Sequence, residues 1–542
     1  MSKKSLVKGA AVLAAAGIVV KLLGAVFRIP LANLIGTVGM ANYSPAYSLY
    51  SFLLVFATTG LPVAISKMVS ERYAIGQFRE AERVFRLSRT LMTAIGVIGF
   101  CVLMFLAKPI AELINVPGSA MSMQATAPAL LLVPLMASYR GYFQGMQEMR
   151  PTAVSQIVEQ LFRVAFGLLL AKLLMDGAFM ASQYTPEQRG AAGGCFGASA
   201  GAVGGLIVML IIYMASRGSI KQRIRRDRTS VRESSKSILK KIAVIAIPIT
   251  VGACIMPIVN LVDAGVVPSR LSASGWERSV VEDLYGQLTG LAAPIVAFPQ
   301  VLIQAIVLSL VPMVSAANKI KDRAGLHRNI SLGIRMAMIL ALPCAFGLFI
   351  LSEPVLLLLY PTQQASVSSA AACLEALSIA FIFLAAITVM TGALQGIGKQ
   401  IIPVRNLFFG VLVKLAVTWV LTAIPAINVV GASIGTICAY IVAAALDFMA
   451  LKKYTAVKVP MSLAVVKPLI SALVMAVIVF FSYRGIYALL GSNGTATLLS
   501  IVIGVVVYGL MILRTKTIER EEMMSMPMGA KLAAICEKLR LW

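Results

Sequence analysis

Positive charges inside long apolar segments are the chemically most informative feature of this 542-residue sequence. A charge near the middle of a bilayer costs a few kcal/mol or more unless it faces water or an opposite charge. Lys172, Arg335 and Arg405 lie near segment ends, where long side chains can reach the interface. The remaining basic residues within such segments need a water-filled cavity or an acidic partner, and they are Lys21, Arg28, Arg140, Arg163 and Lys414.

Lys21 and Arg28 are seven residues apart, which places both on one helix face, about 10 Å from each other. Their own apolar segment contains no acid that could neutralise them. We interpret the pair as lining a wet, positively charged cleft, which would concentrate an anionic substrate. The alternative is that acids from other helices pair with both residues.

A second candidate cluster begins with Glu159 and Arg163, which are four residues apart and can pair with each other on one helix. A structural salt bridge between them is the default interpretation. Arg140, in the preceding segment, is a candidate second cation that would leave the cluster net positive. Such a cluster could hold phosphate through bidentate contacts. Lys414 is the corresponding candidate for the cavity in the second half of the chain.

The elements that must position these charges are membrane-spanning helices. The chain is 59% hydrophobic and only 13% charged, and fourteen apolar runs are each about 20 residues long, enough to cross a bilayer. We therefore predict an all-α polytopic membrane protein with fourteen transmembrane helices. Lys3 and Lys4 resemble the start of a signal peptide, but the apolar run continues past Lys21, which predicts an uncleaved first helix.

The net charge of +26 is distributed by topology rather than for nucleic-acid binding. With the N-terminus inside, about 35 of the 48 basic residues fall on cytoplasmic loops and tails and about 5 on outside loops. This asymmetry predicts a multi-pass protein of the cell membrane with both termini in the cytoplasm. It also predicts contact between the basic loops and anionic lipid headgroups.

An internal echo indicates that the chain contains two copies of one helical unit. Gly141, Gln144 and Gly145 form a GxxQG sequence that returns about 250 positions later as Gly392, Gln395 and Gly396. Two further matched pairs are Pro30 with Pro257, and Pro62 with Pro312. Prolines inside helices remove a hydrogen bond and favour bends. We treat Pro30, Pro257 and the two GxxQG sequences as structural hinge and packing positions.

The repeat predicts two six-helix lobes related by pseudo-twofold symmetry, plus two added helices. Glycines at every fourth position from 193 to 205 predict a flat face for close helix packing. The predicted parts are a first lobe over 1–215, a basic cytoplasmic linker over 216–237, a second lobe over 238–452, the added helix pair over 453–513 and a basic amphipathic cytoplasmic tail over 514–542.

The sequence gives no sign of a metal site, a cofactor or catalytic chemistry. Its seven cysteines are scattered singly and form no CxxC, so we interpret them as small apolar packing residues. The single histidine, His327, falls in a predicted cytoplasmic loop and cannot form a proton relay across the membrane. We expect neither metal nor cofactor.

Three stretches resemble the stage V sporulation protein B family of polysaccharide-biosynthesis exporters, which belongs to the MOP superfamily and is close to the MurJ lipid II flippases. They are residues 21–33, residues 60–67, and residues 139–145 together with 156–163. The resemblance implies two six-helix lobes around a central cavity that opens alternately to each side. It also implies an undecaprenyl-diphosphate-linked saccharide as cargo, chiefly the peptidoglycan precursor lipid II.

The same resemblance also concerns the basic residues of the first two spans. Basic residues of span 1 are functional in the related flippases, and Lys21 and Arg28 occupy that region here. Those flippases also carry arginines in span 2, whereas this chain has none between Tyr43 and Ser66. By analogy, the last two helices would form a groove for the lipid tail. The energy source stays open between the membrane potential and a coupling ion, H⁺ or Na⁺.

Two other functions compete with the flippase. A MATE-type cation or drug antiporter shares the superfamily fold but needs carboxylates in its cleft, whereas basic residues outnumber acids at mid-depth here. A membrane enzyme, such as a lipid-linked glycosyltransferase, would require a larger outside loop with catalytic carboxylates than residues 264–283 provide. We therefore expect a transporter rather than an enzyme.

Overall fold

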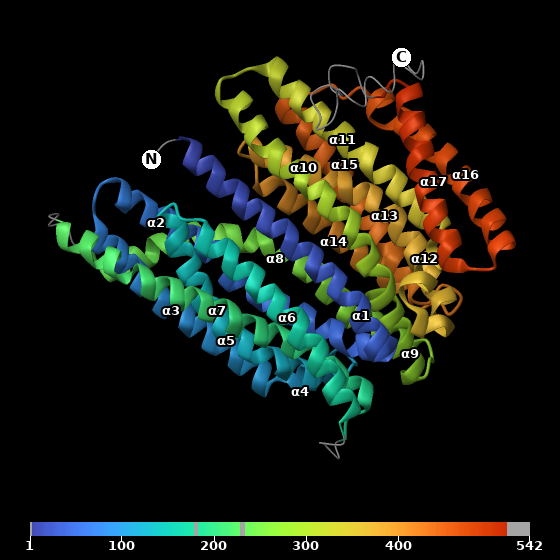
Figure 1. Cartoon of the computed structure of the whole chain (residues 1–542), viewed down its shortest axis with the longest axis horizontal. Helices are drawn as coiled ribbons and strands as arrows, with labels where there is room; N and C mark the ends of the chain where they lie inside the picture. Colours follow the sequence, from blue (N-terminus) through green and yellow to red (C-terminus); the bar gives the residue numbers. More distant parts are fainter. Residues whose placement is uncertain (1–2, 178–182, 228–232, 518–542) are drawn as a thin grey trace. The chain divides into compact units, whose positions relative to one another are not determined.

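The computed structural model describes residues 3–177, 183–227 and 233–517, and these residues are almost entirely helical (Figure 1). The prediction of an all-α polytopic membrane fold is confirmed. Most of the predicted tail, 518–542, lies outside the described residues. The chain divides into two compact units, Met1–Gly290 and Leu291–Trp542.

The first unit contains nine α-helices in its described part: α1 (Lys3–Thr58), α2 (Gly60–Ala74), α3 (Phe78–Phe105), α4 (Ala107–Leu113), α5 (Ser119–Gly145), α6 (Arg150–Asp176), α7 (Pro186–Arg226), α8 (Ser235–Ala273) and α9 (Arg278–Gly286). The second unit contains, in its described part, α10 (Ala293–Lys319), α11 (Arg323–Ile350), α12 (Ser352–Leu359), α13 (Gln364–Gly396), α14 (Ile401–Leu421), α15 (Val430–Thr455), α16 (Lys467–Leu490) and α17 (Asn493–Arg514). A π-helical turn, Gln287–Ala292, joins α9 to α10.

Twelve helical ranges in the described part of the chain are long and apolar enough to cross a membrane. One of them, Ala15–Ala74, has 60 residues and would measure about 90 Å as a straight helix, three times the roughly 30 Å hydrocarbon core. Helix α6 is not among the twelve, and it carries Glu159, Arg163 and Lys172. The count of fourteen therefore stays a prediction.

The long helix α1 is interrupted at Gly36, whose φ of 71° and ψ of 180° are open essentially to glycine alone. Arg28 and Tyr47, on either side of the break, would lie about 28 Å apart on a straight helix. Instead, the Arg28 guanidinium carbon is 5.7 Å from the centre of the Tyr47 ring. The chain therefore folds back at Gly36, while the helix continues through Pro30.

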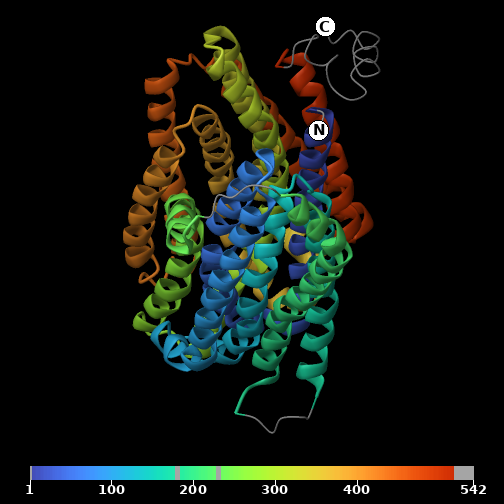
Figure 2. The same ribbon diagram turned by 90° about the vertical axis from the view of Figure 1, so that its left-hand side faces the viewer.

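Helices α6 and α7 lie side by side along much of their lengths (Figure 2), and glycines of α7 explain how closely they pack. A Cβ at Gly193 would come within 2.5 Å of the Leu170 backbone, and one at Gly197 within 2.6 Å of the Arg163 carbonyl oxygen. A Cβ at Gly201 would lie 2.6 Å from the Glu159 carbonyl oxygen. The prediction that these glycines serve close helix packing is confirmed.

The two GxxQG sequences make the same kind of contact in their respective units. In the first unit, Gly141 and Gly145 bring α5 onto α2, with Cβ positions 2.9 Å from the Pro62 carbonyl oxygen and 2.6 Å from Val69. In the second unit, Gly392 and Gly396 bring α13 onto α10, 2.6 Å from Val307 and 2.7 Å from Val314. Gln144 donates a 3.4 Å hydrogen bond to Thr152, and Gln395 is exposed.

A polar clamp centred on Glu233 ties the beginning of α8 to α2 and α3. The Glu233 carboxylate lies 2.5 Å from Arg72 of α2 and 2.6 Å from Lys241 of α8. Ser237 donates a 2.6 Å hydrogen bond to the same carboxylate, and Arg83 of α3 donates to the Glu233 backbone carbonyl. Arg72 is only 8% exposed, so the clamp fixes where α8 begins.

The Glu233 clamp makes stability depend on pH. Burial by itself would raise the pKa of the Glu233 carboxyl, but hydrogen bonds from Lys241 and Ser237 and the charge of Arg72 lower it to about 2. Because an unperturbed glutamate titrates near about 4.3, the stabilisation is fully present above that pH. It is lost as the pH falls through about 2.

We predict that Glu233→Gln lowers the stability of the purified protein at pH 7 by about 1–3 kcal/mol, because it removes charge-assisted hydrogen bonds. Thermal unfolding in detergent at pH 7, 5 and 3 measures this effect, and the difference from wild type should shrink between pH 5 and 3. Glu277→Gln is the control, since Glu277 is exposed and in no ion pair with the described residues. Equal melting temperatures for Glu233→Gln and wild type at pH 7 would contradict the clamp.

Candidate functional site

Three tyrosines follow the fold-back of α1 and form an aromatic stripe inside the first unit. Tyr43, Tyr47 and Tyr50 are spaced by four and three residues, so they share one helix face. The rings of Tyr43 and Tyr47 are stacked, with centres 5.6 Å apart and planes 7° from parallel. Tyr47 and Tyr50 are 5.8 Å apart. Tyr43 and Tyr50 are each 2% exposed, whereas Tyr47 is half-buried.

Two arginines from different helices meet at Tyr47. The guanidinium carbon of Arg28, from α1, is 5.7 Å from the Tyr47 ring centre, and that of Arg163, from α6, is 4.7 Å away. Both distances allow cation–π attraction. Within the described part of the chain, neither guanidinium lies within ion-pair distance of a carboxylate. The ring therefore holds two positive charges close together without neutralising them.

The carboxylate of this region, Glu159, forms an ion pair with a third arginine, Arg140. The Arg140 guanidinium lies 2.7 Å from the Glu159 carboxylate and donates a 2.9 Å hydrogen bond to Ser155. The expected pairing of Glu159 with Arg163 is therefore wrong, because Arg140 reaches Glu159 from α5 while Arg163 turns to Tyr47. Three arginines and one glutamate leave a net charge of +2. We call Arg28, Arg140, Glu159, Arg163 and Tyr47 the arginine–tyrosine cluster.

Close helix contacts bring the cluster together. A Cβ at Gly201 of α7 would lie 3.1 Å from the Cβ of Arg163, and one at Gly205 would lie 3.1 Å from the Cβ of Glu159. The α7 glycines therefore leave room for the first atoms of both side chains, whose charged ends reach Tyr47 and Arg140. On the other side, a Cβ at Gly24 of α1 would lie 3.4 Å from Gln160 of α6, and one at Gly167 would lie 3.0 Å from Phe27. Small residues therefore position both the α6–α7 and α1–α6 contacts.

Two of the predicted cavity residues lie outside the cluster. Lys21 is exposed, seven residues before Arg28 on α1. Lys414 belongs to α14 of the second unit, where it is 2% exposed. Lys414 shares α14 with Asn406, which donates a 2.8 Å hydrogen bond to Asp447 of α15. The second unit therefore contains a buried polar group of its own on α14 and α15.

The tyrosines are candidate functional residues that the sequence analysis, which considered charged residues, did not identify. Their signal is present in the sequence as aromatic residues at 43, 47 and 50, in a region with no basic residue between Tyr43 and Ser66. A tyrosine face can gather cations from other helices, and it also offers a flat surface on which a sugar ring can stack. Among the described residues, no group of His, Cys, Asp or Glu is suited to hold a metal ion.

A multi-pass helical membrane protein with a positively charged cluster among its first helices has the features of a membrane transporter or flippase. Residues 6–318 match the family described as polysaccharide biosynthesis protein, and residues 289–420 match the MatE family. The first match covers more than half of the chain. The chain belongs to the polysaccharide biosynthesis protein family.

Three curated relatives match most of this chain and most of their own length, at low identity. The uncharacterized membrane protein YabM of Bacillus subtilis is 28% identical, over 97% of this chain and 96% of its own. Lipid II flippase MurJ of the same organism is 28% identical over 84% of each chain. Stage V sporulation protein B of Bacillus subtilis is 23% identical over 98% of this chain and 99% of its own.

Solved structures share the fold. Lipid II flippase MurJ in an inward closed conformation matches with a TM-score of 0.63, at 14% identity, over 92% of this chain and 97% of its own. An inward-facing multidrug resistance MATE family transporter of the MOP superfamily matches with a TM-score of 0.64, at 14% identity, over 81% and 94%. The relatives with a stated activity are flippases and transporters rather than enzymes, and this chain is a multi-pass membrane protein of that class.

We predict that Arg140 and Glu159 are energetically coupled. In a double-mutant cycle with Arg140→Gln and Glu159→Gln, either single change should destabilise the protein by about 1–3 kcal/mol, since it leaves a polar or charged group without its partner. The double variant should recover at least about 1 kcal/mol of the summed losses. Thermal unfolding in detergent measures all three.

The control pairs Arg140→Gln with Glu112→Gln, because Glu112 is exposed on α4 and in no ion pair with the described residues. These two changes should be additive. A cycle for Arg140 and Glu159 that is equally additive would show that the ion pair contributes nothing to the folded state.

Proposed function

We propose that this chain moves an undecaprenyl-diphosphate-linked saccharide, with lipid II as the first candidate, from the inner to the outer leaflet. The observation that carries the proposal is the pair of guanidiniums at Tyr47, which have no carboxylate partner within the described residues. A diphosphate carries the charge that two arginines can bind, and guanidinium groups bind phosphate oxygens bidentately. The cluster would bind the headgroup in a cationic central cavity that opens alternately to each side.

The tyrosine face suits the rest of the headgroup. Tyr47 is half-buried and stacked on Tyr43, so one aromatic surface lies beside the two cations. A saccharide attached to the diphosphate would lie beside the half-buried Tyr47 while the phosphates contact Arg28 and Arg163. Arg140, which pairs with Glu159 at 2.7 Å, would add positive charge to the site while keeping its carboxylate partner.

An apolar cavity in the second unit suits the lipid tail. It has a volume of about 610 Å³ and is lined by α10, α11, α12, α16 and α17. The added helices contribute Met475 and Val479 of α16 together with Ile501, Val505 and Tyr508 of α17, and α16 and α17 form a hairpin in Figure 1. A prenyl chain would fill such a lining by contact with hydrocarbon alone.

A MATE-type cation antiporter is the second candidate function, supported by the match of residues 289–420 to the MatE family. It would need an available carboxylate to exchange a cation. In the first unit Glu159 is already paired with Arg140, which favours an anionic cargo. In the second unit, Asp447 is buried and hydrogen-bonded to Asn406. Because this carboxylate is present, a coupling ion, H⁺ or Na⁺, stays part of the proposal. The proposal also places both termini in the cytoplasm.

Charge reversal tests the headgroup site. Arg28→Glu and Arg163→Glu should each lower complementation of a flippase-depleted strain by at least about tenfold, since each replaces a phosphate-binding group by a repelling one. Arg484→Glu is the matched control, because Arg484 also lies over an aromatic ring, Phe480 at 4.3 Å, but on α16. Membrane levels of each variant are measured alongside growth. Normal growth of Arg28→Glu and Arg163→Glu would overturn the proposal.

Thiol labelling tests whether the cationic face is wet. In a cysteine-free background, Lys21→Cys and Arg28→Cys should react with a membrane-impermeant thiol reagent, because a polar headgroup requires a water-accessible path. Ala202→Cys is the control, since Ala202 is buried on α7 and should stay unlabelled. Protection of both positions under all conditions would mean that they are sealed inside protein.

A further inference from the structure

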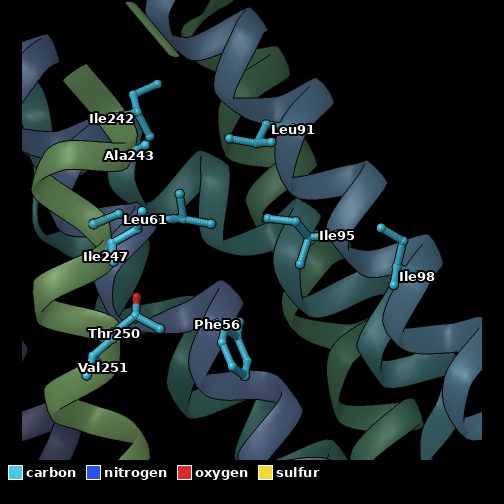
Figure 3. A pocket seen from close by; sticks show the side chains of 11 residues that line it. Phe56, Leu61, Leu91, Ile95, Ile98, Ile242, Ala243, Ile247, Thr250 and Val251 are labelled. Carbon is cyan, nitrogen blue, oxygen red and sulfur yellow. The ribbon is translucent and has the colours of Figure 1, made fainter. Parts of the chain in front are cut away.

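A separate apolar groove lies in the first unit between α3 and α8 (Figure 3). Leu91, Ile95 and Ile98 of α3 face Ala243, Ile247 and Val251 of α8 across a cavity of about 410 Å³. Its outer edge is open, since Ile98 is 64% exposed and Ile247 and Val251 are each 60% exposed. This groove shares no residue with the arginine–tyrosine cluster.

The dimensions of the groove match one leaflet of a bilayer. Both walls belong to candidate membrane spans, Phe78–Phe105 and Ser235–Cys254. Along α8 the lining runs from Ile242 to Val251, a rise of about 14 Å, which is half of the roughly 30 Å hydrocarbon core. On α8 the lining begins seven residues after the helix starts, so the groove lies toward the end at which α8 begins.

Cations lie at that end of the groove. Lys236 and Lys240 precede Ala243 and Ile247 by seven residues each, so they lie on the same side of α8 as the lining. Both lysines are exposed and in no ion pair with the described residues. Lys241, in contrast, is already paired with Glu233 at 2.6 Å. Two exposed lysines, in no ion pair with the described residues, therefore lie at one end of the apolar groove.

We propose that this groove binds an acyl chain of an anionic phospholipid, with the lipid phosphate held by Lys236 and Lys240. A hydrocarbon chain suits a lining whose polar side chain is Thr250 alone. A peptide in the same place would leave its backbone polar groups without partners. Anionic lipid fits the lysines better than a zwitterionic one, because each basic residue near the surface adds electrostatic attraction.

The bound lipid would join α3 to α8 along one leaflet. The Glu233 clamp already connects these helices at their beginnings, and the lipid chain would extend that connection to Ile98 and Val251. Binding would then stabilise the packing of α8 on the first unit. This role is independent of the cargo, so a negative result leaves the flippase proposal untouched.

The test uses the purified full-length protein and phosphatidylglycerol that carries a photoreactive group on one acyl chain. We expect crosslinks within 91–98 and 242–251, identified by peptide mass spectrometry. Ala243→Phe, which fills the groove, should reduce them by about fivefold or more, as expected for loss of a buried chain site. Val244→Phe is the matched control, since Val244 is 65% exposed and outside the lining.

A second pair of variants tests the headgroup. Lys236→Gln with Lys240→Gln should reduce the preference for phosphatidylglycerol over phosphatidylethanolamine by about tenfold. Lys452→Gln with Lys453→Gln, two exposed lysines at the end of α15, should not change it. Equal labelling by both lipids in the wild type would overturn the anionic-lipid assignment. Displacement by undecaprenyl phosphate but not by phosphatidylglycerol would assign the groove to the cargo tail, and absence of crosslinks would overturn the site itself.

Discussion

The cost of a positive charge inside a membrane is the constraint on which the first unit depends. An arginine there needs water or an opposite charge, and the acid of the cluster, Glu159, is bound by Arg140. Arg28 and Arg163 are therefore stabilised by the electron-rich face of Tyr47 instead. Cation–π attraction is weaker than an ion pair and leaves the charges available, as the proposed binding of an anionic headgroup requires.

The glycines are the reason why this cluster can form at all. The α7 glycines let the backbone of α6 and the Cβ atoms of Arg163 and Glu159 approach closely. The charged ends of these two side chains then reach Tyr47 of α1 and Arg140 of α5. The break at Gly36 then returns α1 so that Tyr47 lies beside Arg28. A larger residue at these positions would displace whole helices, and the charges would lose their common ring.

Much of the fold could be predicted from the sequence, because apolar length and glycine spacing are local signals. The all-helical membrane fold and the glycine-lined face of α7 followed from them directly. The partner of Glu159 was predicted wrongly, because a spacing of four residues shows only which partners a helix offers to itself. Arg140, expected only as an additional cation, reaches Glu159 from another helix. Tyr47 was missed because two long-range contacts, with α6 and with the earlier part of α1, give it its role.

The two GxxQG sequences show which features the two halves of the chain share. Both bring their helix onto a partner through glycine, α5 onto α2 and α13 onto α10. The charges do not follow the repeat, because Arg140 precedes the first GxxQG sequence and Thr391 precedes the second. Thr391 lies 3.5 Å from Asp447, which Asn406 also binds, so this part of the second unit carries a carboxylate held by neutral donors. The two halves therefore share their helix packing but not their charges, which is what a duplicated scaffold needs if, as we propose, the arginine–tyrosine cluster of one half binds an anionic headgroup.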